Sequence, residues 1–314
     1  MHSTERTHRG RPVTPPPTSA ATPLERARLS LEGLALGDAF GDQFFASTVE
    51  VGRCLFARRL PPGPWRWTDD TQMAIALVAE LEAPGAVEPA RLAARFAEGY
   101  ERGRGYGPAM HGLLREARSG EAIVAAAARL FGGQGSFGNG AVMRVPPLGA
   151  FFADAPERLP EEAARSARAT HAHPEAAAGA IAVASATAFL TRGEPVTLPG
   201  LVEAVLPAVP AGPTRDALER VTALSLELAP AEAARRTGAA GDITCMVTTP
   251  FVLWCAARHP DDLEAALWAT VAGLGDRDTH CAIVGGMLAP RIGGLPAAWL
   301  ARREPLGKPA RAET

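Results

Sequence analysis

The apolar residues of this chain recur at helical spacing along almost its whole length, and this constrains the fold more than any other feature. Alanine is abundant, aromatic residues make up 6% of the chain, and alternating runs of β-branched residues are nearly absent. Pro and Gly clusters separate the periodic segments, and no fixed repeat period links them. We therefore predict an all-α globule with helices at 26–45, 72–83, 87–101, 108–130, 140–152, 158–170, 174–192, 214–228, 244–258, 261–273 and 279–290.

Length and charge set the broad class of the protein. The 314 residues, 47% of them apolar, suffice for one large domain or two closely joined ones. Residues 1–24 are polar and Pro/Thr-rich and predict a disordered tail, and the Arg/Lys/Pro-rich end predicts a second tail at 304–314. One helical domain over 25–303 remains. The formal charge of −2 argues against bulk electrostatic binding of nucleic acid or of an acidic membrane.

The sequence predicts a cytoplasmic monomer. No apolar run approaches transmembrane length without interruption, and no signal-peptide segment follows the first Met. The four cysteines show no Cys-x-x-Cys spacing, so we expect buried free thiols in a reducing compartment. A monomer is the expectation because the sequence shows no coiled-coil pattern and no conspicuous apolar edge.

Two short acidic clusters, far apart in the sequence, each begin an apolar helical segment: Thr68-Asp69-Asp70-Thr71 and Asp276-Arg277-Asp278-Thr279. Carboxylates beside hydroxyl groups are the ligands that hard divalent cations prefer. Either cluster alone is more simply interpreted as an ordinary helix N-cap. Two clusters with one shared pattern favour a common metal site, because four facing carboxylates could hardly stay buried without cations.

The first predicted helix carries Gly33, Gly37 and Gly41, spaced four apart on one face. Each interior glycine destabilises a helix by about 1 kcal/mol relative to alanine. Close approach of another backbone would compensate, and we favour that interpretation for Gly33 and Gly41. Asp38 lies beside this face in an apolar segment, so we expect it to hold a metal-ligating residue in place.

A glycine-rich segment, Phe131 to Arg144, leads into another predicted helix. Its backbone could form an anion site suited to a phosphate or a diphosphate, or it could be a flexible connector. Further along, Thr170-His171-Ala172-His173-Pro174 predicts a helix boundary with one histidine turned into a cleft, in preference to a transition-metal site. The segment 102–108, which contains Gly105 and Tyr106, is either a solvated basic loop or the rim of a pocket.

Taken together, these blocks resemble the ADP-ribosylglycohydrolase family, the all-α group that includes the dinitrogenase-reductase-activating enzyme. The matching blocks follow the family order and span about residues 31–300: Leu36–Gly41, Thr68–Thr71, Gly135–Arg144, Thr170-His171, and Gly275–Thr279 with Gly285 and Gly286 after it. The segments 104–107 and 135–140 look closest to the branch that removes ADP-ribose from serine.

The resemblance implies two Mg²⁺ or Mn²⁺ ions, with ADP-ribose lying across them. The implied metal ligands are Thr68, Asp69, Asp70, Asp276, Asp278 and Thr279. Asp69 and Asp278 are the expected catalytic carboxylates, which orient a water molecule or take its proton. The implied substrate contacts are the diphosphate loop (Gly135, Ser136, Gly138, Asn139 and Gly140), Phe131 or Phe137 beside the adenine, His171 near the ribose, and Gly105 and Tyr106 at the rim. The expected activity is hydrolysis of the glycosidic bond between ADP-ribose and a protein side chain or a small molecule.

Two positions depart from the family pattern. Phe45 stands where many members have a metal-reaching Glu, so either Asp42 or Glu50 replaces it or the site is gated differently. Arg277 separates the two aspartates, where it would contact a substrate phosphate or pair with a neighbouring carboxylate. Three alternative functions stay open: a catalytically silent ADP-ribose-binding relative, a metal hydrolase of phosphate esters, and a module that reads ADP-ribosylated targets.

Overall fold

The computed structural model describes residues 21–45, 48–83, 86–116 and 119–307, and over these ranges all regular secondary structure is helical. The predicted all-α class is therefore confirmed. The helices are α1 (Pro23–Asp42), α2 (Thr48–Ala57), α3 (Asp69–Leu81), α4 (Pro89–Gly99), α5 (Pro108–Glu116), α6 (Gly120–Gly133), α7 (Pro146–Phe151), α8 (Leu159–Arg168), α9 (Pro174–Thr191), α10 (Leu198–Val205), α11 (Pro213–Val221), α12 (Pro230–Thr237), α13 (Cys245–Arg258), α14 (Leu263–Val271), α15 (Arg277–Ile292) and α16 (Ala297–Leu300). Short 3₁₀ turns lie at Arg102–Arg104, Asn139–Ala141, Pro156–Arg158 and Leu206–Ala208.

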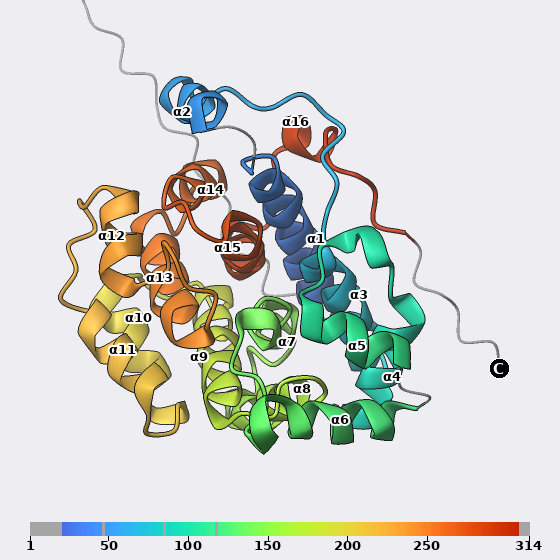
Figure 1. Ribbon diagram of the computed structural model, residues 1–314. Helices are drawn as coiled ribbons and strands as arrows, with labels where there is room; N and C mark the ends of the chain where they lie inside the picture. Colours follow the sequence, from blue (N-terminus) through green and yellow to red (C-terminus); the bar gives the residue numbers. More distant parts are fainter. Residues whose placement is uncertain (1–20, 46–47, 84–85, 117–118, 308–314) are drawn as a thin grey trace, which may run out of the picture.

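The centre of the fold is the contact between α1 and α15, which is the largest helix–helix interface among the described elements (Figure 1). All three glycines of α1 face the backbone of α15. A Cβ atom on Gly33, Gly37 or Gly41 would lie 2.4, 1.9 and 2.3 Å from a carbonyl oxygen of α15. Such distances are impossible for a side chain, so glycine is required at each position. The sequence interpretation holds for Gly33 and Gly41, and it extends to Gly37.

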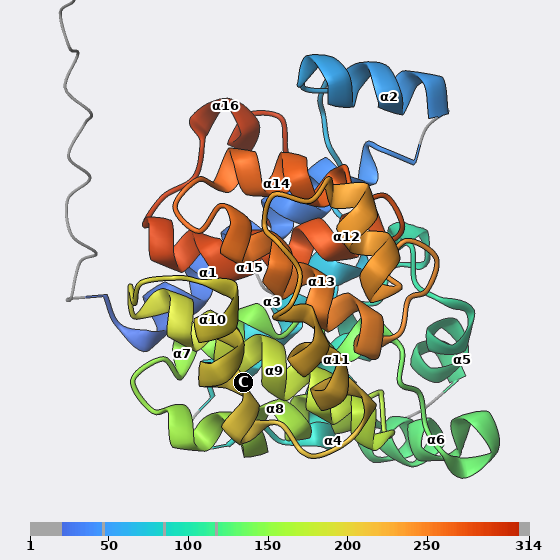
Figure 2. The ribbon, with the colours of Figure 1, turned by 90° about the vertical axis from the view of Figure 1, so that its left-hand side faces the viewer.

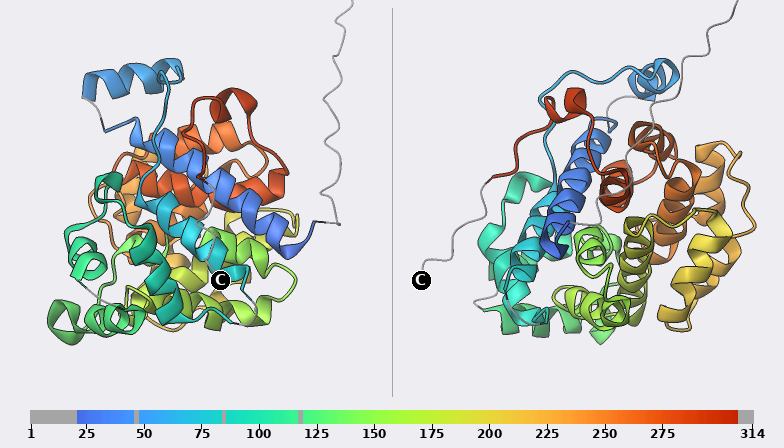
Figure 3. Two further views of the ribbon diagram at one scale, coloured as in Figure 1. Left: turned by 90° about the vertical axis from the view of Figure 1, so that its right-hand side faces the viewer. Right: turned by 180° about the vertical axis from the view of Figure 1, so that it is seen from behind.

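The other helices flank this pair on two sides. In Figure 1, α3, α4 and α5 lie on one side and α10 to α13 on the other, with α7, α8 and α9 between them, and the view from behind in Figure 3 shows the same arrangement reversed. α9 is long and apolar enough to cross a membrane by length and composition, contrary to the sequence expectation. However, 72% of its apolar window is buried inside the protein, as is typical of a core helix.

Several helices differ from the sequence prediction. The segment 108–130 forms two helices, α5 and α6, and the segment 140–152 becomes helical only from Pro146. Proline suits the first turn of a helix because that turn needs no N–H partner there, so Pro146 begins α7 and does not kink it. The helices α2, α10, α12 and α16 were not predicted. α2 stands at the edge of the molecule in Figure 2.

The two ends of the described chain are fixed by side-chain hydrogen bonds. Thr22 caps α1 through a capping box with Glu25, whose carboxylate accepts a 2.7 Å hydrogen bond from the Thr22 N–H. Glu304 accepts two hydrogen bonds from the buried Arg104, at 2.8 and 2.9 Å. The remainder of the predicted tails, residues 1–20 and 308–314, lies outside the described residues.

Candidate active site

One cavity of about 320 Å³ gathers most of the predicted site residues. Its walls come from the first turns of α3 and α15, from the glycine-rich segment, and from the turn before α9. The predicted residues that line it are Asp69, Asp70, Gly105, Phe131, Ser136, Gly138, Asn139, Gly140, His171, Asp276, Asp278 and Thr279. Four predicted residues do not line it: Thr68, Gly135, Tyr106 and Phe137.

The first turn of α3 is held by Asp38 of α1, whose side chain is fully buried. The Asp38 carboxylate accepts hydrogen bonds from the backbone N–H and the hydroxyl of Thr68, at 2.8 and 2.9 Å. It accepts two more from the N–H and the hydroxyl of Thr71, at 3.1 and 2.5 Å. Asp38 thus anchors the helix start that presents Asp69 and Asp70, which is the holding role expected from the sequence.

Thr68 faces the same network and not the cavity. Its hydroxyl donates toward Asp38 or Asp70, whose oxygens lie 2.9 Å away in both cases. On the opposite cluster, the hydroxyl of Thr279 lies 3.5 Å from the Asp70 carboxylate, so the two helix starts meet at this point. The acidic clusters, far apart in sequence, are therefore neighbours in space.

The gathered carboxylates are electrostatically costly. Burial, followed by the charge of Asp38, raises the pKa of Asp69 to about 7, and burial raises the pKa of Asp38 to about 6. For Asp70 the pKa is raised well above its ordinary value by burial and then by Asp38 and Asp278. For Asp278 the causes are burial and then Asp276. Burial is the main reason that each carboxyl resists ionisation, and acidic neighbours add to it for Asp69, Asp70 and Asp278.

Two oxygens of this cluster, Asp70 Oδ1 and Asp278 Oδ1, are buried and have no hydrogen-bond partner among the described residues. Buried carboxylate oxygens are normally paired. A hard cation would pair them and would offset the mutual repulsion, so the donor set fits divalent cations with oxygen ligands. Among the described residues, no group of three or more His, Cys, Asp or Glu side chains already converges as a metal-binding set. The residues share a cavity wall without forming a closed coordination shell.

The glycine-rich segment is tied to the residues that precede α13. The N–H of Asn139 donates to the carbonyl of Ile243 at 2.9 Å, and the N–H of Cys245 donates to the carbonyl of Phe137 at 3.0 Å. The Asn139 side chain donates to Asp276 at 2.7 Å, which joins the segment to the second acidic cluster. The segment is therefore an ordered wall of the cavity and not a flexible connector.

His171 lines the cavity beside this wall, and a Cβ on Gly140 would lie 2.9 Å from its Nε2 atom. His173 instead accepts a hydrogen bond from the N–H of Glu175 at 3.1 Å and caps α9. The helix boundary with one histidine in the cleft is thus confirmed. A Cβ on Gly135 would lie 2.7 Å from the backbone nitrogen of His173, so this position requires glycine.

Of the three aromatic residues that were predicted as substrate contacts, only one lines the cavity. Phe131 lines the cavity and is 63% exposed, with a left-handed backbone (φ +52°) that is unusual for a bulky residue. Phe137 packs edge-on against His173, away from the cavity. Tyr106 is buried, and its hydroxyl donates to Gln72 at 2.8 Å, whereas Gly105 approaches Asp69. The backbone of the segment 102–108 thus lies at the rim of the cavity, whereas the ring of Tyr106 does not.

The structure explains the unusual Arg277 as a tether. Its guanidinium donates to the carbonyl of Phe44 at 2.7 Å and lies 5.2 Å from the ring centroid of Phe45. Phe45 is 52% exposed, and neither it nor Asp42 lines the cavity. No ion pair of Arg277 is found among the described residues. The side chain of Glu50 lies outside the described part of the protein.

Sequence reasoning missed the apolar part of the cavity, which is formed by Met73, Met110, Met143, Leu130 and Ile243. Ile243 is 62% exposed at the mouth, and its carbonyl holds the glycine-rich segment. The turn around Ile243 is closed by Asp242, whose carboxylate accepts a 2.8 Å hydrogen bond from the N–H of Thr244, the residue before α13.

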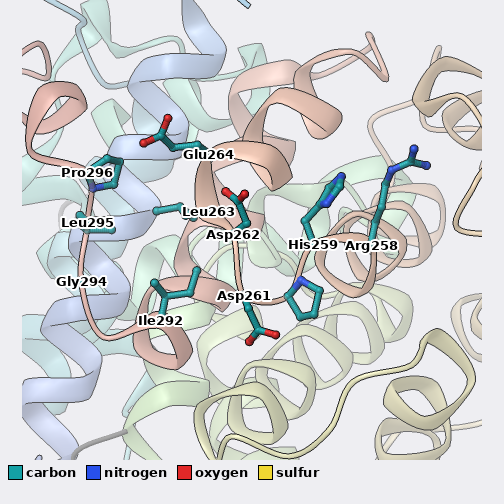
Figure 4. A pocket seen from close by; sticks show the side chains of 11 residues that line it. Arg258, His259, Asp261, Asp262, Leu263, Glu264, Ile292, Gly294, Leu295 and Pro296 are labelled. Atoms are coloured by element: carbon teal, nitrogen blue, oxygen red, sulfur yellow. The ribbon is translucent and has the colours of Figure 1, made fainter. Parts of the chain in front are cut away.

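A wider pocket of about 700 Å³ lies between the start of α14 and the segment after α15 (Figure 4). Two of its three acidic side chains have structural roles. Asp261 pairs with Arg291 at 2.8 Å, and Asp262 caps α14 by accepting from the Ala265 N–H at 2.9 Å. None of the predicted site residues lines this pocket.

The fold and the cavity together define an all-α protein with an acidic site at two facing helix starts. The model of the ADP-ribosylglycohydrolase family matches residues 19–312, and the chain belongs to this family. A solved structure titled as an ADP-ribosylglycohydrolase-related protein complex superimposes with a TM-score of 0.65 at 28% identity. That similarity covers 90% of this chain and 93% of the other.

Individual relatives are similar at modest identity. The human ADP-ribosylhydrolase ARH3 is 33% identical over 191 residues, which is 56% of this chain and 52% of the human protein. The bovine ADP-ribosylhydrolase ARH3 is 34% identical over the same length, so the chain spans about half the length of these relatives. The mouse ADP-ribosylhydrolase ARH3 is 27% identical over 326 residues, which covers 90% of this chain and 88% of the mouse protein.

Proposed function

We propose that this protein is a metal-dependent hydrolase that cleaves the glycosidic bond between ADP-ribose and an acceptor. One observation carries the proposal: Asp69, Asp70, Asp276 and Asp278 line one cavity, and two of their buried carboxylate oxygens have no partner among the described residues. A site that concentrates negative charge in this way is suited to cations and unsuited to a bare anionic ligand.

The proposed ligands of two Mg²⁺ or Mn²⁺ ions are Thr68, Asp69, Asp70, Asp276, Asp278 and Thr279. Thr68 would need to turn from Asp38, to which it is now hydrogen-bonded. When bound, the ions would bind the ribose hydroxyls and lower the pKa of a water molecule. Octahedral coordination by oxygen suits both metals, so the donor set does not choose between them.

The residues of the chain would act around the anomeric carbon of the ADP-ribosyl group. Asp69 or Asp278 would orient the attacking water and take its proton. The bond from the anomeric carbon to the acceptor breaks as the new bond to water forms, through a transition state with cationic character in the ribose ring. The acceptor leaves with the bonding electron pair and gains one proton, which balances the proton that the carboxylate takes from the water.

The adjoining glycine-rich wall and the cavity mouth would bind the rest of ADP-ribose. The ordered segment of Ser136, Gly138, Asn139 and Gly140 offers a close backbone approach for a diphosphate. Phe131, exposed at the mouth, would stack on the adenine. Because Phe137 faces His173, we assign the adenine contact to Phe131 alone.

We propose as substrates proteins or small molecules that carry ADP-ribose. The relatives titled ADP-ribosylhydrolase ARH3 favour an acceptor of the kind that those proteins process, although the first of them match over only half of their length. The acidic wall itself recognises the ribose and does not distinguish a serine acceptor from an arginine acceptor.

The decisive experiment measures free ADP-ribose released from proteins modified separately on serine and on arginine. The assay is run with Mg²⁺, with Mn²⁺ and with EDTA. We expect metal-dependent release from one substrate and none after Asp278→Asn. The matched control is Asp216→Asn, which changes an exposed aspartate of α11 and should keep the wild-type rate. Wild-type release in EDTA, or wild-type activity of the Asp278 variant, would overturn the proposal.

Two other functions make different predictions in the same assay. A reader of ADP-ribosylated targets would bind ADP-ribose without releasing it under any metal condition. A phosphate-ester hydrolase would release inorganic phosphate from simple esters, with no effect on ADP-ribosylated protein. We rank both lower because the chain belongs to the ADP-ribosylglycohydrolase family and retains all six proposed ligands.

We further propose that the protein acts as a cytoplasmic monomer. The four cysteines are free, and three of them (Cys245, Cys255 and Cys281) are buried, which suits a reducing compartment. Light scattering after size-exclusion chromatography tests the monomer, and a mass corresponding to two chains would contradict it.

A further inference from the structure

Arg144 is fully buried beneath the cavity and pairs with no acidic side chain among the described residues. Its guanidinium donates to the carbonyl of Gly140 at 2.9 Å, to the carbonyl of Ser166 at 2.6 Å and to the hydroxyl of Thr170 at 2.9 Å. Burial lowers its pKa to about 9, so it is still protonated at neutral pH. A buried cation without a counter-charge is expensive, which calls for a role beyond packing.

The hydroxyl of Thr170 connects this cation to the cavity. Thr170 is fully buried, and its Oγ1 atom lies 2.8 Å from Nδ1 of His171. Arginine can only donate, so Oγ1 accepts from Arg144 and has its single proton left to give. The nearest acceptor for that proton is Nδ1 of His171. If Nδ1 carried a proton instead, the Thr170 hydroxyl would be left buried without an acceptor, which is the costly arrangement.

The other ring nitrogen of His171 faces the ligand side. Nε2 lies close to Gly138 and Gly140, where an added Cβ would be 3.8 and 2.9 Å away, and it makes no hydrogen bond to the described part of the chain. Burial, together with the charge of Arg144, lowers the pKa of His171 to about 3. The ring is therefore neutral at physiological pH, and its one proton resides on Nε2.

We propose that Arg144 and Thr170 are positioning residues that fix the tautomer of His171, so that Nε2–H donates a hydrogen bond to an acceptor oxygen of the ligand. His171 then selects ligands by their oxygen acceptors, such as a ribose hydroxyl or a phosphate, and takes no part as a base. That the ligand is ADP-ribose rests on the proposed function, whereas the tautomer is a property of the protein alone.

The tautomer is tested by ¹⁵N NMR of the ligand-free full chain with labelled histidine. The sequence contains seven histidines, and the spectrum of a His171→Gln variant assigns the resonances of His171. We expect a protonated Nε2 and an unprotonated Nδ1 at neutral pH. A protonated Nδ1, or a doubly protonated ring, would overturn the proposal, and this result needs no variant of Thr170 to fold.

Two substitutions separate the hydroxyl from the shape of the side chain. Thr170→Val keeps the shape and removes the hydroxyl, so both tautomers should become populated. Thr170→Ser retains the hydroxyl and should restore the wild-type spectrum. Unfolding temperatures of both variants, measured in parallel, show whether each is folded. A Thr170→Val spectrum identical to that of the wild type would contradict the role of the hydroxyl.

Binding of ADP-ribose, measured by calorimetry, links the tautomer to the ligand. Thr170→Val should weaken binding about tenfold, which is the scale of one oriented hydrogen bond, and Thr170→Ser by about twofold at most. Equal affinities of wild type and Thr170→Val would overturn the selective role of Nε2–H. A wild-type protein with the expected tautomer that binds no ADP-ribose would support the positioning of His171 and contradict the proposed function.

Discussion

Gly37 of α1 and Cys281 of α15 touch backbone to backbone, because a Cβ on Gly37 would lie 1.9 Å from the Cys281 carbonyl oxygen. This contact helps to position the candidate site, because a residue of the site lies close to it on each helix. Asp38, which anchors the start of α3, directly follows Gly37, and Asp278 lies one turn before Cys281. The position of α1 against α15 therefore fixes how far apart the two acidic clusters lie.

The first prediction concerns this contact. Gly37→Ala should lower the free energy of unfolding by about 3 kcal/mol or more, because a fixed backbone cannot yield to the added methyl group. Gly112→Ala is the matched control. Gly112 lies in α5 with nothing within 4 Å of an added Cβ, so alanine should stabilise the protein by about 0.5–1 kcal/mol. Denaturant unfolding measures the free energy of unfolding of both variants. Equal changes in this free energy would contradict the close backbone contact at Gly37.

The second prediction concerns metal binding without turnover. Mg²⁺ or Mn²⁺ should raise the unfolding temperature of the wild type, because an ion that binds only the folded state stabilises it. Asp278→Asn should lose most of this increase, and the exposed Asp216→Asn should retain it. Differential scanning fluorimetry with increasing metal concentration measures the effect. An undiminished increase in the Asp278 variant would remove this residue from the proposed ligand set.

The third prediction follows from the raised carboxyl pKa values. In EDTA, Asp38 and Asp69 have folded pKa values of about 6 and 7, above their unfolded values, so the folded state binds more protons. Their contribution to stability is present at low pH and is lost as pH rises through 6 and 7. Stability in EDTA should fall over this range by at most about 1.4 kcal/mol per pH unit for each net proton released.

Metal should remove that dependence, because bound cations favour the ionised carboxylates. The measurement is a series of denaturant titrations between pH 5 and pH 8, a range that includes the pKa values of Asp38 and Asp69. The series is run once in EDTA and once in Mg²⁺. A stability in EDTA that is constant or rises with pH would show that the carboxylates are not crowded as described.

The fourth prediction concerns Phe131 at the cavity mouth. Phe131→Ala should weaken ADP-ribose binding about tenfold or more, since stacking of an aromatic side chain on a base contributes about 1–3 kcal/mol. Stability should change little because the ring is 63% exposed. Phe56→Ala is the control, since Phe56 of α2 is 96% exposed and lies outside the cavity. Equal affinities of the two variants would remove Phe131 from the ligand contacts.

The sequence predicted the long helices well because each buries a continuous apolar face. It failed for α10, α12 and α16, which are short and have a proline near the start. Pro199, Pro230 and Pro296 stand at or next to the first turn of these helices, where the missing N–H costs nothing. Composition alone does not distinguish a proline that ends one element from a proline that begins the next.

The candidate site was predictable where a residue type demands particular chemistry. Carboxylates at helix starts and the histidine before α9 are of this kind, and both reach the cavity. Phe137 and Tyr106 could not be placed, because a one-residue change in a loop decides whether a ring faces a cavity or the core. The role of Arg144 was equally hidden, since it depends on Thr170 and Ser166, which only the packing of α8 brings close.

The contact between α1 and α15 also bears on how this chain can tolerate change in length. The spacing between the two acidic clusters is set across a helix crossing and not along the intervening chain, so insertions in the surface connections of residues 43–276 need not alter it. A single deletion within α1 between Gly33 and Asp38 would act differently. It would rotate the Asp38 carboxylate by about 100° around the axis of α1, away from α3, although every other residue of the site remained present.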